Sequence, residues 1–226
     1  MATLNALDET RLQRGRDTAQ TIVRGLRSPE ILPATYPALY EGGVTEGSFH
    51  SYVLSALLLL GSQLEYSAVC DSPIFDRLDN LLLGESSKRP DSIWFERGTE
   101  TVRVLIEFER YTANSLGPKA RNLLLMSNSC AEDVNLLVLM YWTVQVRDAA
   151  QLRRACELFK RGFRSKGSRF GPAPCPLLLL ETIVERRGER LTISSFVAKQ
   201  FIFGGENKSY VVEDLNQPNR ESRADS

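Results

Sequence analysis

Apolar residues recur along this chain with two periods, one typical of helices and one typical of strands. Spacings of three, four or seven residues, as between Leu12, Ala19, Ile22 and Leu26, predict an amphipathic helix. Helices are predicted in this way over residues 8–27, 45–60, 115–127 and 148–163, and Gly61 is expected to end the second. Alternating or continuous apolar runs predict strands over residues 63–70, 91–95, 101–109, 135–145, 177–184 and 191–203.

The remaining segments suggest how the chain is divided. Residues 28–44 contain three prolines and two glycines and are expected to form a connecting loop. Residues 75–83 predict a short helical insert, and the polar residues 205–226 a flexible tail. We therefore expect an N-terminal helix and loop over residues 1–44 and one domain over residues 45–204. The order of elements predicts an α/β fold with a mixed central sheet flanked by helices and extra C-terminal strands.

The clearest chemical pattern lies in residues 89–112, RPDSIWFERGTETVRVLIEFERYT, which are predicted to form a hairpin. Because alternate residues of a strand share a face, Glu107 and Glu109 lie side by side at the end of an apolar strand. A three-residue loop over 98–100 places Asp91 opposite Glu107, whereas a two-residue loop shifts the pairing by one residue. Directly opposed residues have Cβ atoms about 4.5–5.5 Å apart. Local geometry alone therefore predicts that Asp91, Glu107 and Glu109 come together.

Three carboxylates this close repel one another, and a hard divalent cation such as Mg²⁺ relieves the repulsion because it prefers carboxylate oxygens. The alternative is that the acids form a solvated strand end or pair with Arg103 and Arg110.

The same residues resemble the motif of the PD-(D/E)xK nuclease superfamily, which has the restriction-endonuclease-like fold. Pro90–Asp91 matches the Pro-Asp of the motif, and Glu107, 16 residues later, matches its second acid. Glu109 stands where the family usually has lysine, although some restriction enzymes of the superfamily carry Glu-x-Glu. The family core of helix, three strands, helix and strand corresponds to residues 45–145. The resemblance therefore implies a restriction-endonuclease-like core.

Two further residues match positions that contribute to the site in this family. Glu46 begins the first core helix, where a glutamate often joins the site, but an acid in a first helical turn also stabilises the helix dipole. Lys119 follows the motif on the next helix, as in members whose lysine has migrated, but it is also read as an ordinary surface lysine. His50 lies one turn beyond Glu46, within reach of the edge of the site, but a lone histidine in a helix is more often an ordinary hydrogen-bonded residue.

The resemblance implies metal-assisted hydrolysis of phosphodiester bonds, with DNA as the expected substrate. Asp91, Glu107 and the carbonyl of Phe108 are then the expected ligands of Mg²⁺, for which Mn²⁺ substitutes. Glu109 is expected to orient or deprotonate the attacking water, or to bind the same metal.

A basic stretch is the candidate surface for nucleic acid. Between Phe159 and Phe170 five positive charges occur without an acid, and the flanking Phe163 and Phe170 are candidates for stacking on bases. The alternative is a solvated helix end that favours cations. The five residues are Lys160, Arg161, Arg164, Lys166 and Arg169.

Composition narrows the function classes. Lys+Arg and Asp+Glu both number 28, so the chain is not basic overall. Four widely spaced cysteines and a single histidine make a Cys/His zinc site improbable and favour free thiols. No signal peptide or membrane span is recognised, so we expect a cytoplasmic protein without a membrane partner.

Three readings of function remain open. The first is a Mg²⁺-dependent endonuclease of the restriction, defence or repair kind, for which a homodimer suits paired cuts. The second is an inactive nuclease-like module that binds nucleic acid or a protein partner, and the missing motif lysine favours it. The third is an oligomeric structural protein whose hairpin acids pair with arginine across an interface.

Overall fold

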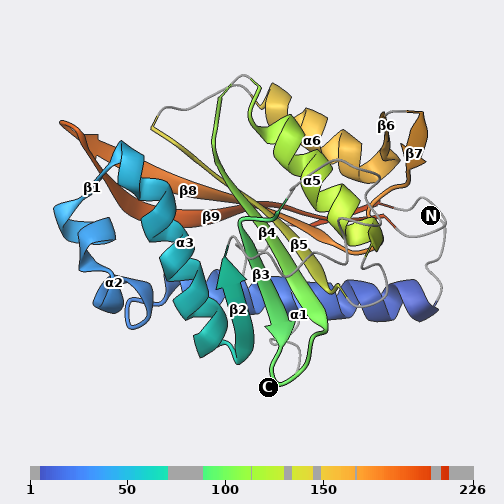
Figure 1. Ribbon diagram of the computed structural model, residues 1–226, viewed down its shortest axis with the longest axis horizontal. Helices are drawn as coiled ribbons and strands as arrows, with labels where there is room; N and C mark the ends of the chain where they lie inside the picture. The colour runs from blue at the N-terminus through green and yellow to red at the C-terminus, as the bar shows by residue number, and fades with distance from the viewer. Residues whose placement is uncertain are drawn as a thin grey trace, which may run out of the picture.

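The computed structural model describes residues 6–70, 89–112, 114–129, 134–144, 149–165, 167–204 and 210–213 (Figure 1). The predicted insert over 75–83, Lys166 and most of the expected tail lie outside these ranges. Among the residues described, no helix combines the length and apolarity needed to cross a membrane. Cys70, Cys156 and Cys175 are free thiols.

One mixed sheet organises the chain. Its strands follow the order β1-β9-β8-β5-β4-β3-β2, and β10 pairs with the end of β9 opposite to the one that β1 pairs with. The central strands β4, β5 and β8 are parallel to one another, whereas the outer pairings are antiparallel. The strands are β1 (Val44–Thr45), β2 (Tyr66–Cys70), β3 (Ser92–Glu96), β4 (Val102–Arg110), β5 (Leu136–Thr143), β8 (Leu177–Arg187), β9 (Arg190–Gly204) and β10 (Tyr210–Glu213).

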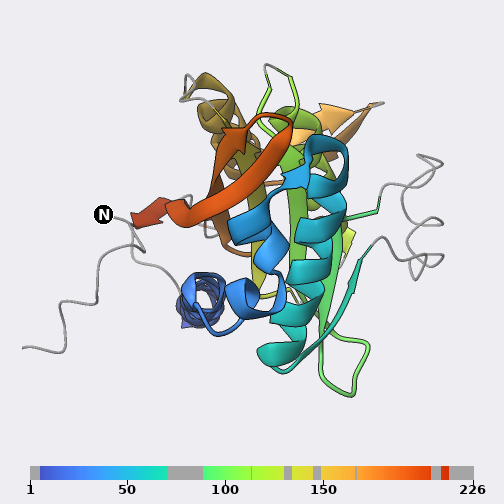
Figure 2. The same cartoon turned by 90° about the vertical axis from the view of Figure 1, so that its left-hand side faces the viewer.

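Helices cover both faces of this sheet, so the fold is α/β. Helices α1 (Ala6–Arg27) and α3 (Glu46–Gln63) pack on the face that carries Val104, Ile106 and Phe108. Helices α5 (Leu116–Ser129) and α6 (Ala150–Arg161) pack on the face that carries Leu105 and Leu139 and lie side by side along it (Figure 1). Figure 2 views α1 end-on, next to the segment that follows it. The central strands are buried on both faces, as their nearly continuous apolar sequence requires.

The segment over 28–44 is more structured than the loop that the prolines and glycines predicted. It contains α2 (Leu32–Thr35) and the π-helical turn η1 (Ala38–Gly42), and it leads into β1. Leu32 and Leu39 are buried in the same core as α1 and α3. Proline is tolerated at the first positions of a helix, and Pro33 stands there in α2.

Helix α3 continues past Gly61, which was expected to end it. A Cβ added at Gly61 would lie 2.5 Å from the Cβ of Ala68 and 2.9 Å from the Trp94 ring. The glycine therefore permits a close approach of α3 to β2 and β3, and the helix ends at Gln63 instead.

The predicted hairpin forms with the predicted register. Ser92, Ile93 and Trp94 pair with Ile106, Leu105 and Val104, and a bulge follows between Trp94 and Phe95. Gly98 takes a positive φ of 76° in the connecting turn, a conformation that favours glycine. One further pair in this register would set Asp91, the residue before β3, opposite Glu107.

The C-terminal half differs from the predictions at two places. Residues 163–170, predicted to be helix end and loop, contain a small hairpin of β6 (Phe163–Ser165) and β7 (Ser168–Phe170). Tyr210–Glu213, within the segment expected to be a flexible tail, forms β10 against β9.

Candidate active site

Strand β4 is longer than its antiparallel neighbour β3, and the site forms beside the C-terminal part of β4 that β3 does not cover. On the β5 side of β4, the Arg103 carbonyl accepts from the Asn135 N–H, and the Tyr111 N–H donates to the Trp142 carbonyl. The backbone groups of the even-numbered residues, Phe108 among them, therefore face β3. Strand β3 begins at Ser92, opposite Ile106, which leaves Phe108 without a strand partner on that side. The Phe108 N–H donates to Asp91 Oδ2 at 2.8 Å, and the His50 ring Nε2 lies 3.2 Å from the Phe108 carbonyl oxygen. Two side chains thus take the place of a neighbouring strand.

Lys119 joins the two hairpin acids. Its Nζ lies 2.9 Å from Asp91 Oδ2 and 2.6 Å from Glu107 Oε2. Asn122, one turn further along α5, donates to Glu107 Oε1 at 3.2 Å. Helix α5 therefore presents an ammonium and an amide to the acids from one face, as i,i+3 spacing allows.

Glu107 is enclosed, whereas its neighbours remain partly accessible. Its side chain is 0% exposed, compared with 14% for Asp91, 21% for Lys119 and 43% for His50. Its Oε2 is buried and has the Lys119 ammonium as its ionic partner at 2.6 Å. The site therefore opens to solvent on the side of His50 and Lys119, and the carboxylates of Asp91 and Glu107 share one cationic partner.

The pKa values of the three groups diverge. Burial, followed by the charge of Asp91, raises the pKa of Glu107 to about 8. Burial alone would raise the pKa of Asp91, but His50, Lys119 and the Phe108 N–H together hold it well below its usual range. Burial opposes the charge on Lys119, yet the two carboxylates raise its pKa above the usual value. Near neutral pH the site therefore contains a charged Asp91, a charged Lys119 and a Glu107 that is readily protonated.

His50 completes the accessible side of the site. Its Nε2 lies 3.8 Å from Asp91 Oδ1, and its ring stacks on that of Phe108 with centroids 5.5 Å apart. The interaction with Asp91 raises the pKa of His50 despite the opposing effect of burial.

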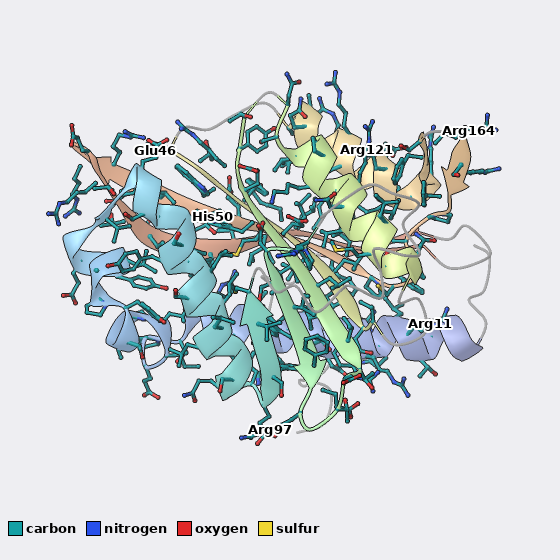
Figure 3. All side chains as sticks on the ribbon, in the orientation of Figure 1. Arg11, Glu46, His50, Arg97, Arg121 and Arg164 are labelled. Carbon is teal, nitrogen blue, oxygen red and sulfur yellow. The ribbon has the colours of Figure 1, made fainter. Side chains whose placement is uncertain are left out.

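Two predicted site residues lie apart from this group. Glu109 Oε1 accepts a hydrogen bond from the Arg110 N–H at 2.8 Å, and no contact joins it to Asp91 or Glu107. Glu46 pairs with Arg110 and Arg186, which lower its pKa. Figure 3 shows Glu46 near the outer end of α3 and His50 closer to the middle of the sheet. The side chain of Arg110 thus pairs with Glu46, and that of Arg103 pairs with Glu96, whereas the alternative had paired these arginines with the hairpin acids.

The donor set at the site fits Mg²⁺ only in part. Among the residues described, no group of three or more His, Cys, Asp or Glu side chains is placed to hold a metal ion. The carboxylates of Asp91 and Glu107 meet at Lys119, and the Phe108 carbonyl oxygen lies 3.2 Å from His50 Nε2. Mg²⁺ commonly takes one or two protein carboxylates, with water and substrate phosphate completing its shell. A cation bound to Glu107 Oε2 would compete with Lys119 or share the carboxylate with it.

The predicted basic stretch is divided between α6 and the β6–β7 hairpin. Arg161 and Lys160 lie 2.8 Å and 3.8 Å from Glu157 carboxylate oxygens, whereas Arg164 and Arg169 are paired across the small hairpin. The rings of Phe163 and Phe170 stack on each other with centroids 5.0 Å apart, so one face of each is already covered.

An arginine-lined groove between α5 and α6 adjoins this stretch. It has a volume of about 770 Å³ and is lined by Arg121, Arg153, Arg154 and Arg161, with Glu157 as the acid among them. Arg121 and Arg164 lie at the same end of the molecule, away from Arg97 in the β3–β4 turn (Figure 3).

Sequence reasoning missed Asn122, Arg186 and three of the groove arginines, Arg121, Arg153 and Arg154, whereas the fourth, Arg161, belongs to the predicted basic stretch. Asn122 carries a usable signal, because it stands three residues after Lys119 on a predicted helix. The groove depends on how α5 and α6 pack, which no local pattern specifies.

Comparisons with models of protein families, with curated protein sequences and with solved structures gave no match.

Proposed function

We propose that this chain is a Mg²⁺-dependent nuclease with a restriction-endonuclease-like core that hydrolyses phosphodiester bonds of DNA. The observation that carries the proposal is the convergence of Asp91, Glu107 and Lys119 at the end of β4, where the Lys119 ammonium lies 2.9 Å from Asp91 Oδ2 and 2.6 Å from the buried Glu107 Oε2. An acid pair with an adjacent lysine is the chemistry that the resemblance to PD-(D/E)xK nucleases implies. Lys119 here supplies the ammonium that the motif position of Glu109 lacks.

Each residue of the site has its own role in the proposed reaction. Asp91, Glu107 and the Phe108 carbonyl would hold the metal. When bound, Mg²⁺ supplies charge stabilisation at the phosphate and a more acidic water. Lys119 stays protonated, so it acts as a donor to a phosphate oxygen or to the attacking water and not as a base. Asn122 holds Glu107 in place, and His50 orients the Phe108 carbonyl.

The groove between α5 and α6 supports nucleic acid as the partner. Arginine forms bidentate contacts with phosphate, and four arginines line one groove. Lys119 and Arg121 stand two residues apart on α5, so the helix connects the site to the groove.

A second candidate is an inactive module that binds nucleic acid. Lys119 already compensates the charges of Asp91 and Glu107, as it would if no metal were required. Lys119 belongs to the same chain as Asp91 and Glu107. Charge balance at these acids therefore does not require an arginine from another subunit, as the hypothesis of a structural oligomer supposes.

A cleavage assay tests the proposal. Plasmid and single-stranded DNA are incubated with Mg²⁺, Mn²⁺ or EDTA and wild-type protein, Asp91→Asn or Glu100→Gln. Glu100 is an exposed acid in the β3–β4 turn and serves as the matched control. Metal-dependent cleavage that Asp91→Asn loses and Glu100→Gln keeps is the expected result. Absence of cleavage by folded wild type with every metal and substrate, together with binding to DNA, favours the inactive module.

A further inference from the structure

A second, smaller cavity lies beside the candidate active site. It has a volume of about 300 Å³ and is partly open to solvent. Polar and apolar side chains share its walls, including Tyr111, Tyr141, Leu152, Glu181, Ile183 and Lys199. Protein sites for small organic groups begin at about this size.

Tyr141 lines this cavity and carries a buried polar atom that has no partner in the part of the chain that the structure describes. Its side chain is 1% exposed, and its hydroxyl has no hydrogen-bond partner among the described residues. Burial raises the pKa of Tyr141 above its usual value, so the phenol stays protonated and able to donate. A buried hydroxyl without a partner is costly, which makes it a candidate for bonding to a ligand.

The cavity and the active site share one face of the sheet. Glu109, Tyr141 and Glu181 pair with one another across β4, β5 and β8. This row lies two residues beyond Glu107 along β4, a distance of about 7 Å. Both sites lie toward the carboxyl ends of the parallel strands, where open α/β sheets bind their ligands.

We propose that this cavity receives one nucleobase of the polynucleotide whose backbone is bound at Asp91, Glu107 and Lys119. The inference rests on the proposed function for the identity of the polynucleotide. The Tyr141 hydroxyl and the Glu181 carboxylate would bond to the polar edge of the base. Leu152 and Ile183 would contact its faces, as in enzymes that bind an unstacked base.

The charges of the cavity favour a neutral heterocycle over an anion. Glu181 and Lys199 form an ion pair at 2.7 Å, so their formal charges cancel. A phosphate group would meet the Glu181 carboxylate and a phenol, whereas the arginine-lined groove offers it a far better environment. A base, in contrast, offers N–H groups to Glu181 and acceptors to Tyr141.

Binding of free deoxynucleosides tests this inference without any need for cleavage. Each of the four is titrated in EDTA into isotope-labelled wild type, Tyr141→Phe and Tyr40→Phe, and amide resonances are followed. Tyr40 is the matched control, because its hydroxyl is also buried without a partner but belongs to η1, which packs against the α1 and α3 face. We expect one or more nucleosides to shift resonances of the cavity residues. We expect Tyr141→Phe to weaken that binding about tenfold and Tyr40→Phe to leave it unchanged.

Two results would overturn the inference: no nucleoside shifts these resonances, or Tyr141→Phe binds as wild type does. The cleavage assay distinguishes failure of the base-binding inference from failure of the proposed nuclease function. A chain that cleaves DNA but binds no nucleoside refutes the base cavity alone. A chain that binds nucleosides at Tyr141 but never cleaves keeps the cavity and refutes the nuclease.

Discussion

The Lys119 ammonium lies 2.6 Å from the carboxylate of Glu107, a side chain that is 0% exposed. The two residues come from different elements, β4 and α5, and the contact holds a positive charge at the end of the strand. A cation that binds Glu107 must therefore compete with Lys119 or share the carboxylate with it.

Replacing Lys119 separates these roles. In Lys119→Met we expect Mn²⁺ to bind more tightly, because the competing ammonium is gone, while cleavage falls by at least about a hundredfold from loss of a charge-stabilising donor. Without metal the variant should lose about 1–3 kcal/mol of unfolding free energy, since Glu107 and Asp91 lose their cationic partner. Calorimetric titration, cleavage kinetics and denaturant unfolding measure the three effects. Unchanged cleavage in this variant would exclude Lys119 from the reaction.

The raised pKa of Glu107 predicts how stability depends on pH in EDTA. Its value of about 8 in the folded state exceeds the unfolded value of 4.5, so the folded protein binds more protons between these values. The stabilising contribution is complete below about pH 4.5 and is lost as pH rises through about 8. The contribution of Asp91 to stability changes with pH in the opposite direction. Because its pKa is lower in the folded state, Asp91 stabilises the fold at pH values above its unfolded pKa, and this stabilisation is lost as pH falls.

The variant Glu107→Gln isolates this contribution. Relative to wild type, its unfolding free energy should rise between about pH 4.5 and 8, by an amount on the order of a few kcal/mol. Denaturant unfolding across this range measures the difference. A difference that does not change with pH would show that Glu107 ionises normally in the folded protein.

Glu46 is predicted to be dispensable for the chemistry. It pairs with Arg110 and Arg186 at a position where its side chain is 33% exposed, and such pairs contribute about 0–1 kcal/mol. Glu46→Gln should therefore change stability by no more than this and leave cleavage within a few-fold of wild type. A loss of cleavage comparable to that of Asp91→Asn would return Glu46 to the active site.

The groove arginines are predicted to set the salt dependence of DNA binding. Replacing Arg121 and Arg154 together by alanine should weaken binding to all sequences and reduce the slope of log affinity against log salt by about 1 per lost phosphate contact. Arg97→Ala, at the β3–β4 turn, is the matched control. Binding isotherms at several salt concentrations provide the test, and equal slopes for the double variant and wild type would remove the groove from the interface.

Local patterns predicted the part of the site that is itself local. The predicted register holds from Ser92 to Trp94, and one further pair in the same register would set Asp91 opposite Glu107. The turn length did not produce this register as predicted, because next to the turn Phe95 pairs with Val102 and the bulge between Trp94 and Phe95 shifts the pairing by one residue. The same reasoning misplaced Glu109, because strand alternation gives the face of a side chain but not its partner, and Glu109 bonds instead to the adjacent Arg110 N–H.

The long-range part of the site was less predictable. The sequence alone leaves Lys119 open between a site residue and a surface lysine, since its contact with the acids depends on how α5 packs on β4. The cavity at Tyr141 depends on the parallel pairing of β4, β5 and β8, which joins segments far apart in the sequence. Neither feature has a local signature comparable to that of the hairpin.

The central claim is that Asp91 and Glu107 form a metal site and not merely an ion-paired cluster with Lys119. Isothermal titration of Mn²⁺ into wild type, Asp91→Asn and Glu100→Gln tests it most directly. We predict saturable binding to wild type and Glu100→Gln that disappears in Asp91→Asn. Absence of binding to folded wild type, or equal binding to all three proteins, would contradict the claim.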